Sequence, residues 1–104
     1  MNSEIISKGF SGEISIDNKQ LQKNVFETIE ALDSGKVRVS EKVSGVWVTH
    51  TWVKQAILLY FRLQKMTVMD SGIFKFIDKI PLKNWSIEDG VRVVPSSVAR
   101  KGSY

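Results

Sequence analysis

The 104-residue chain has the length of one ordinary soluble domain, with 42% hydrophobic and 25% charged residues. It has no cysteine and only one histidine, His50, which excludes a disulfide framework, a thiolate nucleophile, a cysteine-ligated zinc and a histidine cluster. The net charge of +4 allows an anionic partner, either a nucleic acid or an acidic metabolite, although the basic residues are scattered.

The sequence shows no targeting or membrane segment. Its first ten residues lack the charged front and apolar run of a signal peptide. The longest apolar run, Ala56 to Phe61, is too short to cross a bilayer. We therefore expect a cytoplasmic protein without membrane contact.

The first sixteen residues, Met1 to Ile16, are rich in Ser and Gly and show no sustained period, so we expect them to be mostly irregular or frayed. A helical pattern begins at Asp17, with Asp17 or Asn18 as the cap, and stops at Gly35. Its predicted apolar face is Leu21, Val25, Thr28, Ile29 and Leu32. Its predicted polar side is Gln20, Lys23, Asn24, Glu27 and Glu30.

The next stretch, residues 37 to 49, alternates as a β-hairpin with one covered face. Ser44-Gly45 is a suitable two-residue turn, and the resulting register pairs Val43 with Val46, Lys42 with Trp47 and Glu41 with Val48.

This register puts Trp47 on the same face as Arg38 and Lys42. Such a basic, aromatic face can stack on a nucleic-acid base and hold its phosphate. The alternative, which we favour, is a tryptophan covered by the aliphatic stems of the two basic residues.

The most hydrophobic helix is predicted from about His50 to Lys65, capped by Thr49 or Thr51, and apolar residues cover almost all of its circumference. We expect it to be the central buried helix. His50 lies at its first turn without a nucleophile or carboxylate at a motif spacing, which favours a packing or capping role over acid–base chemistry.

Beyond the helix we predict a connection over Lys65 to Gly72 and a short strand over Ile73 to Ile77, with Phe74 and Phe76 on one face. Pro81 prevents the strand from continuing. Leu82 to Gly90 is predicted to be irregular, and Val91 to Val94 extended. Within the extended segment, Arg92 either reaches solvent or holds a carboxylate through its forked donors, and the residues alone leave both readings open.

The tail from Pro95 places Val98 and Tyr104 six residues apart among small residues, the spacing of a hexapeptide β-helix. Such a helix needs several stacked turns to bury its core. The sequence contains no P-loop, no dinucleotide-binding glycine motif, no paired carboxylates at helical spacing and no metal-ligand cluster. We therefore do not expect this chain to catalyse a reaction unaided.

Five short motifs occur together in this chain, in a fixed order. They are Leu32 to Gly35 (LDSG), Arg38 to Lys42 (RVSEK), Trp47 to Trp52 (WVTHTW), Asp78 to Pro81 (DKIP) and Arg92 to Pro95 (RVVP). With them, residues 25 to 104 resemble the amino-terminal region of the tetrahydrodipicolinate N-succinyltransferases, while the first twenty residues match that pattern poorly.

That resemblance implies an acyltransferase that moves succinyl from succinyl-CoA to an amino dicarboxylate formed from tetrahydrodipicolinate, in lysine and diaminopimelate biosynthesis. It also implies a homotrimer of left-handed parallel β-helices. Arg92 matches the family arginine that contacts a carboxylate of the acceptor. No catalytic, cofactor-binding or metal-binding residue carries over to this chain, and succinyl-CoA is the co-substrate of the full enzyme.

The resulting prediction is an α+β domain of two main helices, a hairpin and short extra strands over residues 1–94. Residues 95–104 would begin the β-helix. The fragment itself is expected to be inactive. The alternative is a freestanding basic module that binds nucleic acid through Trp47, Arg38 and Lys42, which we favour less. A third reading is a purely structural or assembly role.

Overall fold

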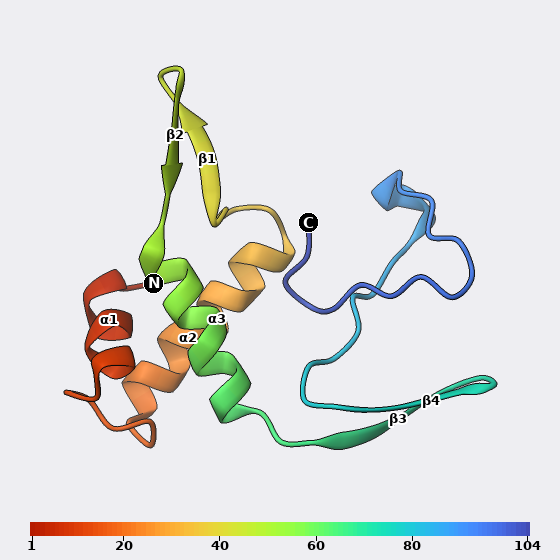
Figure 1. Cartoon of the computed structure of the whole chain (residues 1–104), viewed down its shortest axis with the longest axis horizontal. Helices are drawn as coiled ribbons and strands as arrows, with labels where there is room; N and C mark the ends of the chain where they lie inside the picture. Colours follow the sequence, from red (N-terminus) through yellow and green to blue (C-terminus); the bar gives the residue numbers. More distant parts are fainter.

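Three α-helices pack together, and two separate two-stranded antiparallel sheets extend from them in the computed structural model, which describes all residues 1–104. The α+β class agrees with the prediction. Figure 1 shows the helices gathered on one side, with both hairpins and the loop before the C-terminal segment projecting away from them, while the chain end returns to the helices. The molecule is consequently flat, with extents of 44 × 38 × 17 Å.

Helix α1 (Ser3–Ser11) shows that the prediction of an irregular start was wrong. The side chain of Asn2 caps it by accepting hydrogen bonds from the backbone N–H groups of Glu4 and Ile5. Ile6 is fully buried, and Gly9 lies so close to α2 that a Cβ would stand 2.4 Å from Leu21 Cδ2. The helix spans only nine residues and is stabilised by packing on the other two helices, whereas its serines and glycine are typical of irregular structure.

Helix α2 (Lys19–Asp33) confirms the predicted helix and its apolar face. Of the two suggested caps the structure uses Asn18, whose side chain accepts from the N–H of Leu21 at 3.0 Å. The assignment of Asn24 to the polar side was wrong, because this side chain is buried. It accepts from the backbone N–H of Asn2 and donates to the carbonyl of Gln20, each at 2.8 Å.

Strands β1 (Ser40–Val43) and β2 (Val46–Thr49) pair in the predicted register. Ser44 and Gly45 both have positive φ angles, 49° and 80°, as a tight hairpin turn requires. The expected covered face is absent within the strands, since every residue of both is exposed, and of the predicted face only Val37 and Val39, before β1, are half-buried against the core. The reason is visible in Figure 1, where the hairpin points away from the helices.

Helix α3 (Thr51–Leu63) contacts both α1 and α2 and is the central helix, as predicted. The predicted threonine cap was wrong, because His50 occupies the cap position without a side-chain capping bond. The predicted apolar residues of the helix are all buried or half-buried, and the narrow exposed stripe holds Leu58, 41% exposed, together with Lys54 and Arg62. The core joins ten residues: Ile6, Leu21, Val25, Ile29, Leu32, Val53, Ala56, Leu59, Tyr60 and Ile80.

Strands β3 (Thr67–Ser71) and β4 (Phe74–Asp78) form the second hairpin. The prediction that Lys65 to Gly72 is only a connection was wrong, because β3 lies within it. The sequence of β3, TVMDS, does not alternate clearly between apolar and polar residues. The rings of Phe74 and Phe76 lie on one face as expected, stacked with centroids 6.1 Å apart. Beyond β4 only a single 3-10 turn (Ile87–Asp89) is regular, in agreement with the predicted irregular segment.

No helix in the structure has both the length and the apolar character needed to cross a membrane. Residues 95–104 pair with the rest of the chain through one isolated bridge, between Leu82 and Arg100. The structure shows no β-helix turn in this segment, so its assignment to such a domain stays a prediction.

Candidate functional site

The C-terminal segment returns to the helices and closes a loop that carries Arg92. At the base of this loop, the N–H of Lys83 donates to the carbonyl of Ala99 at 2.9 Å, and the N–H of Lys101 donates to the carbonyl of Pro81 at 2.8 Å. These bonds flank the bridge between the two chain segments. We call residues 84–98 the Arg92 loop. Figure 1 shows it extending away from its base.

The base of the Arg92 loop is fastened to the C-terminal end of α2 by Asp33. One carboxylate oxygen accepts the backbone N–H of Gly102 at 2.7 Å and lies 3.1 Å from Nζ of Lys83. Lys83 also donates to the main-chain carbonyl of Asp33. The Lys83 side chain is only 8% exposed, with its ammonium 5.6 Å from the ring centroid of Trp85 and 5.8 Å from that of Tyr104. We call Asp33, Lys83 and Gly102 the base lock.

The ionised form of Asp33 is favoured in this setting. Partial burial acts to raise the pKa of Asp33, but the N–H of Gly102 and the ammonium of Lys83 outweigh it and hold the pKa below its usual value. The lock is therefore formed with a charged carboxylate at neutral pH.

Two further ion pairs fasten the residues next to the lock. Arg100 donates two hydrogen bonds to the carboxylate of Asp78, at 2.9 and 2.8 Å, and its guanidinium stands over the ring of Phe61. The backbone of Lys79, followed by Arg100, holds the pKa of Asp78 below its usual value. The carboxylate of Glu30 pairs with Lys101 and raises the pKa of that lysine. The tail is thus tied to α2, α3 and β4.

Tyr104 completes the contact with the helical core. Its ring lies directly over Gly35, where a Cβ would stand 2.5 Å from Cε1, and the guanidinium of Arg38 lies 5.3 Å from the ring centroid. Gly35 also has a φ of +75°, as predicted for the left-handed stop of α2. This glycine therefore ends the helix and makes room for the tail.

Arg92, the one site residue inferred from the sequence, is exposed and makes no hydrogen bond or ion pair within the chain. The sequence left two readings open for Arg92: a side chain that reaches solvent, or one that holds a carboxylate. Within this chain the side chain reaches solvent, and no carboxylate of the chain pairs with it. Its guanidinium is free to receive one from outside.

A mostly apolar hollow of about 200 Å³ lies between β4 and the Arg92 loop. Phe74 and Phe76 line one side of it, and Trp85, Val93 and Val98 line the other. Since the neighbour of Arg92, Val93, forms part of the wall, the position of the loop and the shape of the hollow depend on each other.

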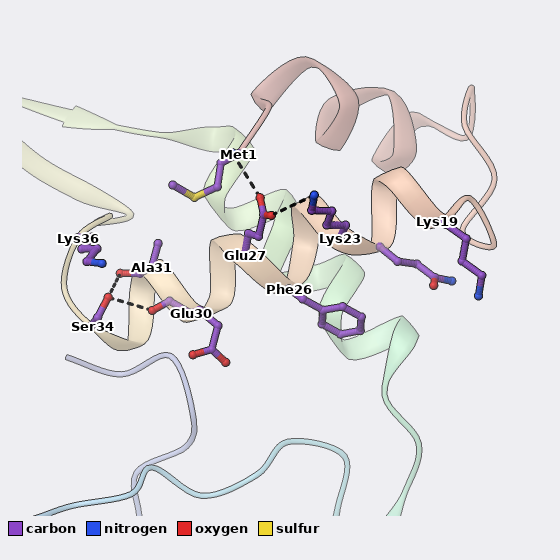
Figure 2. A pocket seen from close by; sticks show the side chains of 10 residues that line it. Met1, Lys19, Lys23, Phe26, Glu27, Glu30, Ala31, Ser34 and Lys36 are labelled. Atoms are coloured by element: carbon purple, nitrogen blue, oxygen red, sulfur yellow. Dashed lines mark hydrogen bonds and ion pairs between the residues drawn. The ribbon is translucent and has the colours of Figure 1, made fainter.

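A second, shallow hollow runs along the outer face of α2 (Figure 2). One of its glutamates is paired within the hollow: Glu27 lies 3.5 Å from the terminal amine of Met1 and 3.9 Å from the ammonium of Lys23. Lys19 and Lys36, which also line the hollow, make no ion pair. Phe26 is 42% exposed and touches the ring of Tyr60 edge-on. The hollow lacks the buried, converging polar groups of a catalytic site.

The basic, aromatic face suggested by the hairpin forms only in part. Lys42 and Trp47 are cross-strand partners, and Trp47 is 70% exposed, so it is not covered in the way we favoured. Arg38 lies before β1, and its ring contact is with Tyr104. His50 instead pairs with the carboxylate of Glu41 at 3.1 Å across the base of the hairpin, a partner that the sequence spacing did not indicate.

The structure has no group of three or more His, Asp or Glu side chains placed to hold a metal ion. The sequence alone does not indicate the base lock, because its members are far apart in the chain. A signal was present, since Asp33 belongs to the LDSG motif and Gly102 to the tail that supported the resemblance.

These features define a small α+β domain whose end is tied back onto its helices. The family model for the tetrahydrodipicolinate N-succinyltransferase N-terminal region matches residues 3–63. The chain therefore belongs to this family. The match includes α1, so the early residues, which matched the pattern poorly by inspection, are part of the family domain.

Individual relatives agree with this assignment. The chain is 45% identical over 97 residues to a 2,3,4,5-tetrahydropyridine-2,6-dicarboxylate N-succinyltransferase of Pseudoalteromonas translucida, covering 88% of this chain and 34% of the relative. Proteins of the same name from Coxiella burnetii and Haemophilus influenzae are 47% and 49% identical, over 83% and 75% of this chain and 33% and 30% of their own lengths. The chain spans about a third of the length of these curated relatives.

Proposed function

We propose that this chain is the amino-terminal part of an N-succinyltransferase acting on tetrahydrodipicolinate. The observation that carries the proposal is the family membership, together with the name shared by relatives 45–49% identical to the chain. In this reaction an amino nitrogen of the acceptor forms an amide with the succinyl carbonyl carbon of succinyl-CoA. The thioester C–S bond breaks, and CoA leaves as its thiol.

The role proposed for this segment is to bind the acceptor through Arg92. A dicarboxylate suits a guanidinium, whose forked N–H donors match a carboxylate in two parallel hydrogen bonds. The exposed position of Arg92 and its lack of an internal partner support the assignment.

The remaining parts of the proposal concern the whole protein. Residues 95–104 would lead into a left-handed β-helix of hexapeptide repeats, and the full enzyme would be a cytoplasmic homotrimer in lysine and diaminopimelate biosynthesis. The groups that bind CoA and transfer the proton would lie in that further region. The 104 residues by themselves would have no transferase activity.

A chimera tests the function directly. Residues 1–104 would replace the corresponding third of the Pseudoalteromonas relative, and succinyl transfer from succinyl-CoA would be followed by release of the CoA thiol. We expect activity from the chimera and none from the isolated chain. An inactive chimera that folds and assembles like the relative, or turnover by the isolated chain free of full-length enzyme, would overturn the proposal.

The role of Arg92 has its own test. In the chimera, Arg92→Gln should raise KM for the acceptor roughly 10- to 100-fold, since a charge-assisted hydrogen bond to a carboxylate is lost. KM for succinyl-CoA should not change. The matched control is Arg62→Gln, which removes another exposed arginine, on α3, that makes no ion pair or side-chain hydrogen bond. Equal KM values for Arg92→Gln and the control would exclude acceptor binding by Arg92.

A further inference from the structure

We propose that Asp33 and Lys83 are positioning residues for acceptor binding, which hold the two ends of the Arg92 loop together and thereby place the Arg92 guanidinium. The inference rests on the proposed function, because it assigns the placed group to the acceptor carboxylate. Neither residue touches the reacting atoms.

The geometry favours this role because three distant parts of the chain meet at one carboxylate. Asp33 ends α2, Lys83 directly precedes the Arg92 loop and Gly102 lies beyond its other end. A loop whose ends are held has far fewer conformations than the same segment attached at one end. Since the loop itself has only one short 3-10 turn, its base and the apolar hollow that Val93 lines constrain where Arg92 lies.

The low exposure of the Lys83 side chain makes its position depend on the charge of Asp33. The Lys83 side chain is 8% exposed, whereas the lysine in the surface pair of Lys75 with Asp70 is 67% exposed. A lysine removed from water is costly unless its charge is paired, so the Asp33 carboxylate stabilises the buried position of Lys83. Loss of either partner should therefore loosen the attachment of the loop base to α2, while the pairs of Arg100 with Asp78 and of Lys101 with Glu30 remain.

Asp33 makes a hydrogen bond in addition to its ion pair with Lys83. It accepts the N–H of Gly102, and an uncharged amide oxygen can also do so. Asp33→Asn should accordingly retain part of the lock, while Asp33→Ala should lose both contacts. An exchange of the two charged residues should not rescue it, because a lysine at position 33 cannot accept the Gly102 N–H.

The kinetic test uses the chimera with Asp33→Asn, Asp33→Ala and Lys83→Met. We expect KM for the acceptor to rise less in Asp33→Asn than in Asp33→Ala and Lys83→Met, in which the increase should reach about tenfold. The turnover number and KM for succinyl-CoA should stay within about twofold. The control is Asp70→Asn, which removes an exposed aspartate pair, 3.7 Å long, on the neighbouring hairpin.

A physical test uses the 104-residue chain and does not need activity. Hydrogen exchange of the Gly102 amide and tryptic cleavage after Arg92 should both accelerate about tenfold in Asp33→Ala and Lys83→Met, but not in Asp70→Asn. If Asp33→Ala fails to fold, Asp33→Asn and Lys83→Met provide the same comparison.

The outcomes separate the two proposals. If Arg92→Gln raises KM for the acceptor and the lock variants do not, the positioning role is wrong and the function stands. If the lock variants lower thermal stability and change both KM values equally, they are only structural. If the chimera is inactive, the function fails, and unchanged cleavage after Arg92 would independently overturn the lock.

Discussion

The carboxylate of Asp33 accepts the backbone N–H of Gly102 at 2.7 Å and so joins two positions 69 residues apart in the chain. The second side-chain contact between the C-terminal segment and α2 is the ion pair of Lys101 with Glu30. The relationship leads to a prediction on pH.

Acid should release the C-terminal segment. The pKa of Asp33 is lower in the folded chain than its ordinary value of 3.8, so its stabilising contribution is fully present above that value. The contribution is lost as the pH falls through the lowered, folded pKa. We expect exchange of the Gly102 amide, corrected for its intrinsic pH dependence, to accelerate only below about pH 4. In Asp33→Asn this added acceleration should be missing; an identical acid response would contradict the assignment.

Gly35→Ala should destabilise the tail and the end of α2 together. A Cβ would stand 2.5 Å from the Tyr104 ring, and the φ of +75° is unfavourable for alanine. We expect a loss of more than about 1 kcal/mol in the free energy of unfolding, measured by urea denaturation. Gly12→Ala is the control, because Gly12 has a φ of +90° at the end of α1 but no atom within 4 Å of the added Cβ. Equal losses would show that Tyr104 plays no part.

Gly9→Ala should disturb the contact between α1 and α2. The added Cβ would stand 2.4 Å from a terminal carbon of Leu21, so this side chain must shift within a closed core. Overpacking of this kind costs about 1–3 kcal/mol. In a Leu21→Val background the cost should fall, because the clashing atoms are removed. A thermal-denaturation cycle of the two changes measures the difference, and strict additivity would contradict the contact.

Leu21→Ala and Trp47→Ala should differ strongly, although tryptophan is the larger residue. Leu21 is fully buried, so its truncation should cost about 2–5 kcal/mol. Trp47 is 70% exposed, and its loss should stay within about 0.5 kcal/mol in the isolated chain. Urea denaturation of both variants gives the comparison. A large loss for Trp47→Ala would mean that the hairpin packs against the helices in solution.

Local features of the fold could be predicted well. The apolar face of α2 follows from its period, and the register of the first hairpin follows from the Ser44-Gly45 turn. Prediction failed where packing decides: α1 is a short helix, rich in serine and glycine, that its neighbours stabilise, and Asn24 is polar yet buried because Asn2, the cap of α1, supplies its partner.

The sequence by itself determined the fold class, the central helix, the family and the candidacy of Arg92, since these depend on neighbouring residues and short motifs. Only the tertiary structure brought Asp33, Lys83 and Gly102 together. Periodicity and motif spacing describe the chain locally, whereas a hydrogen bond between distant positions depends on how the helices and the tail fold back on one another. The residues that hold the Arg92 loop were for that reason found only in three dimensions.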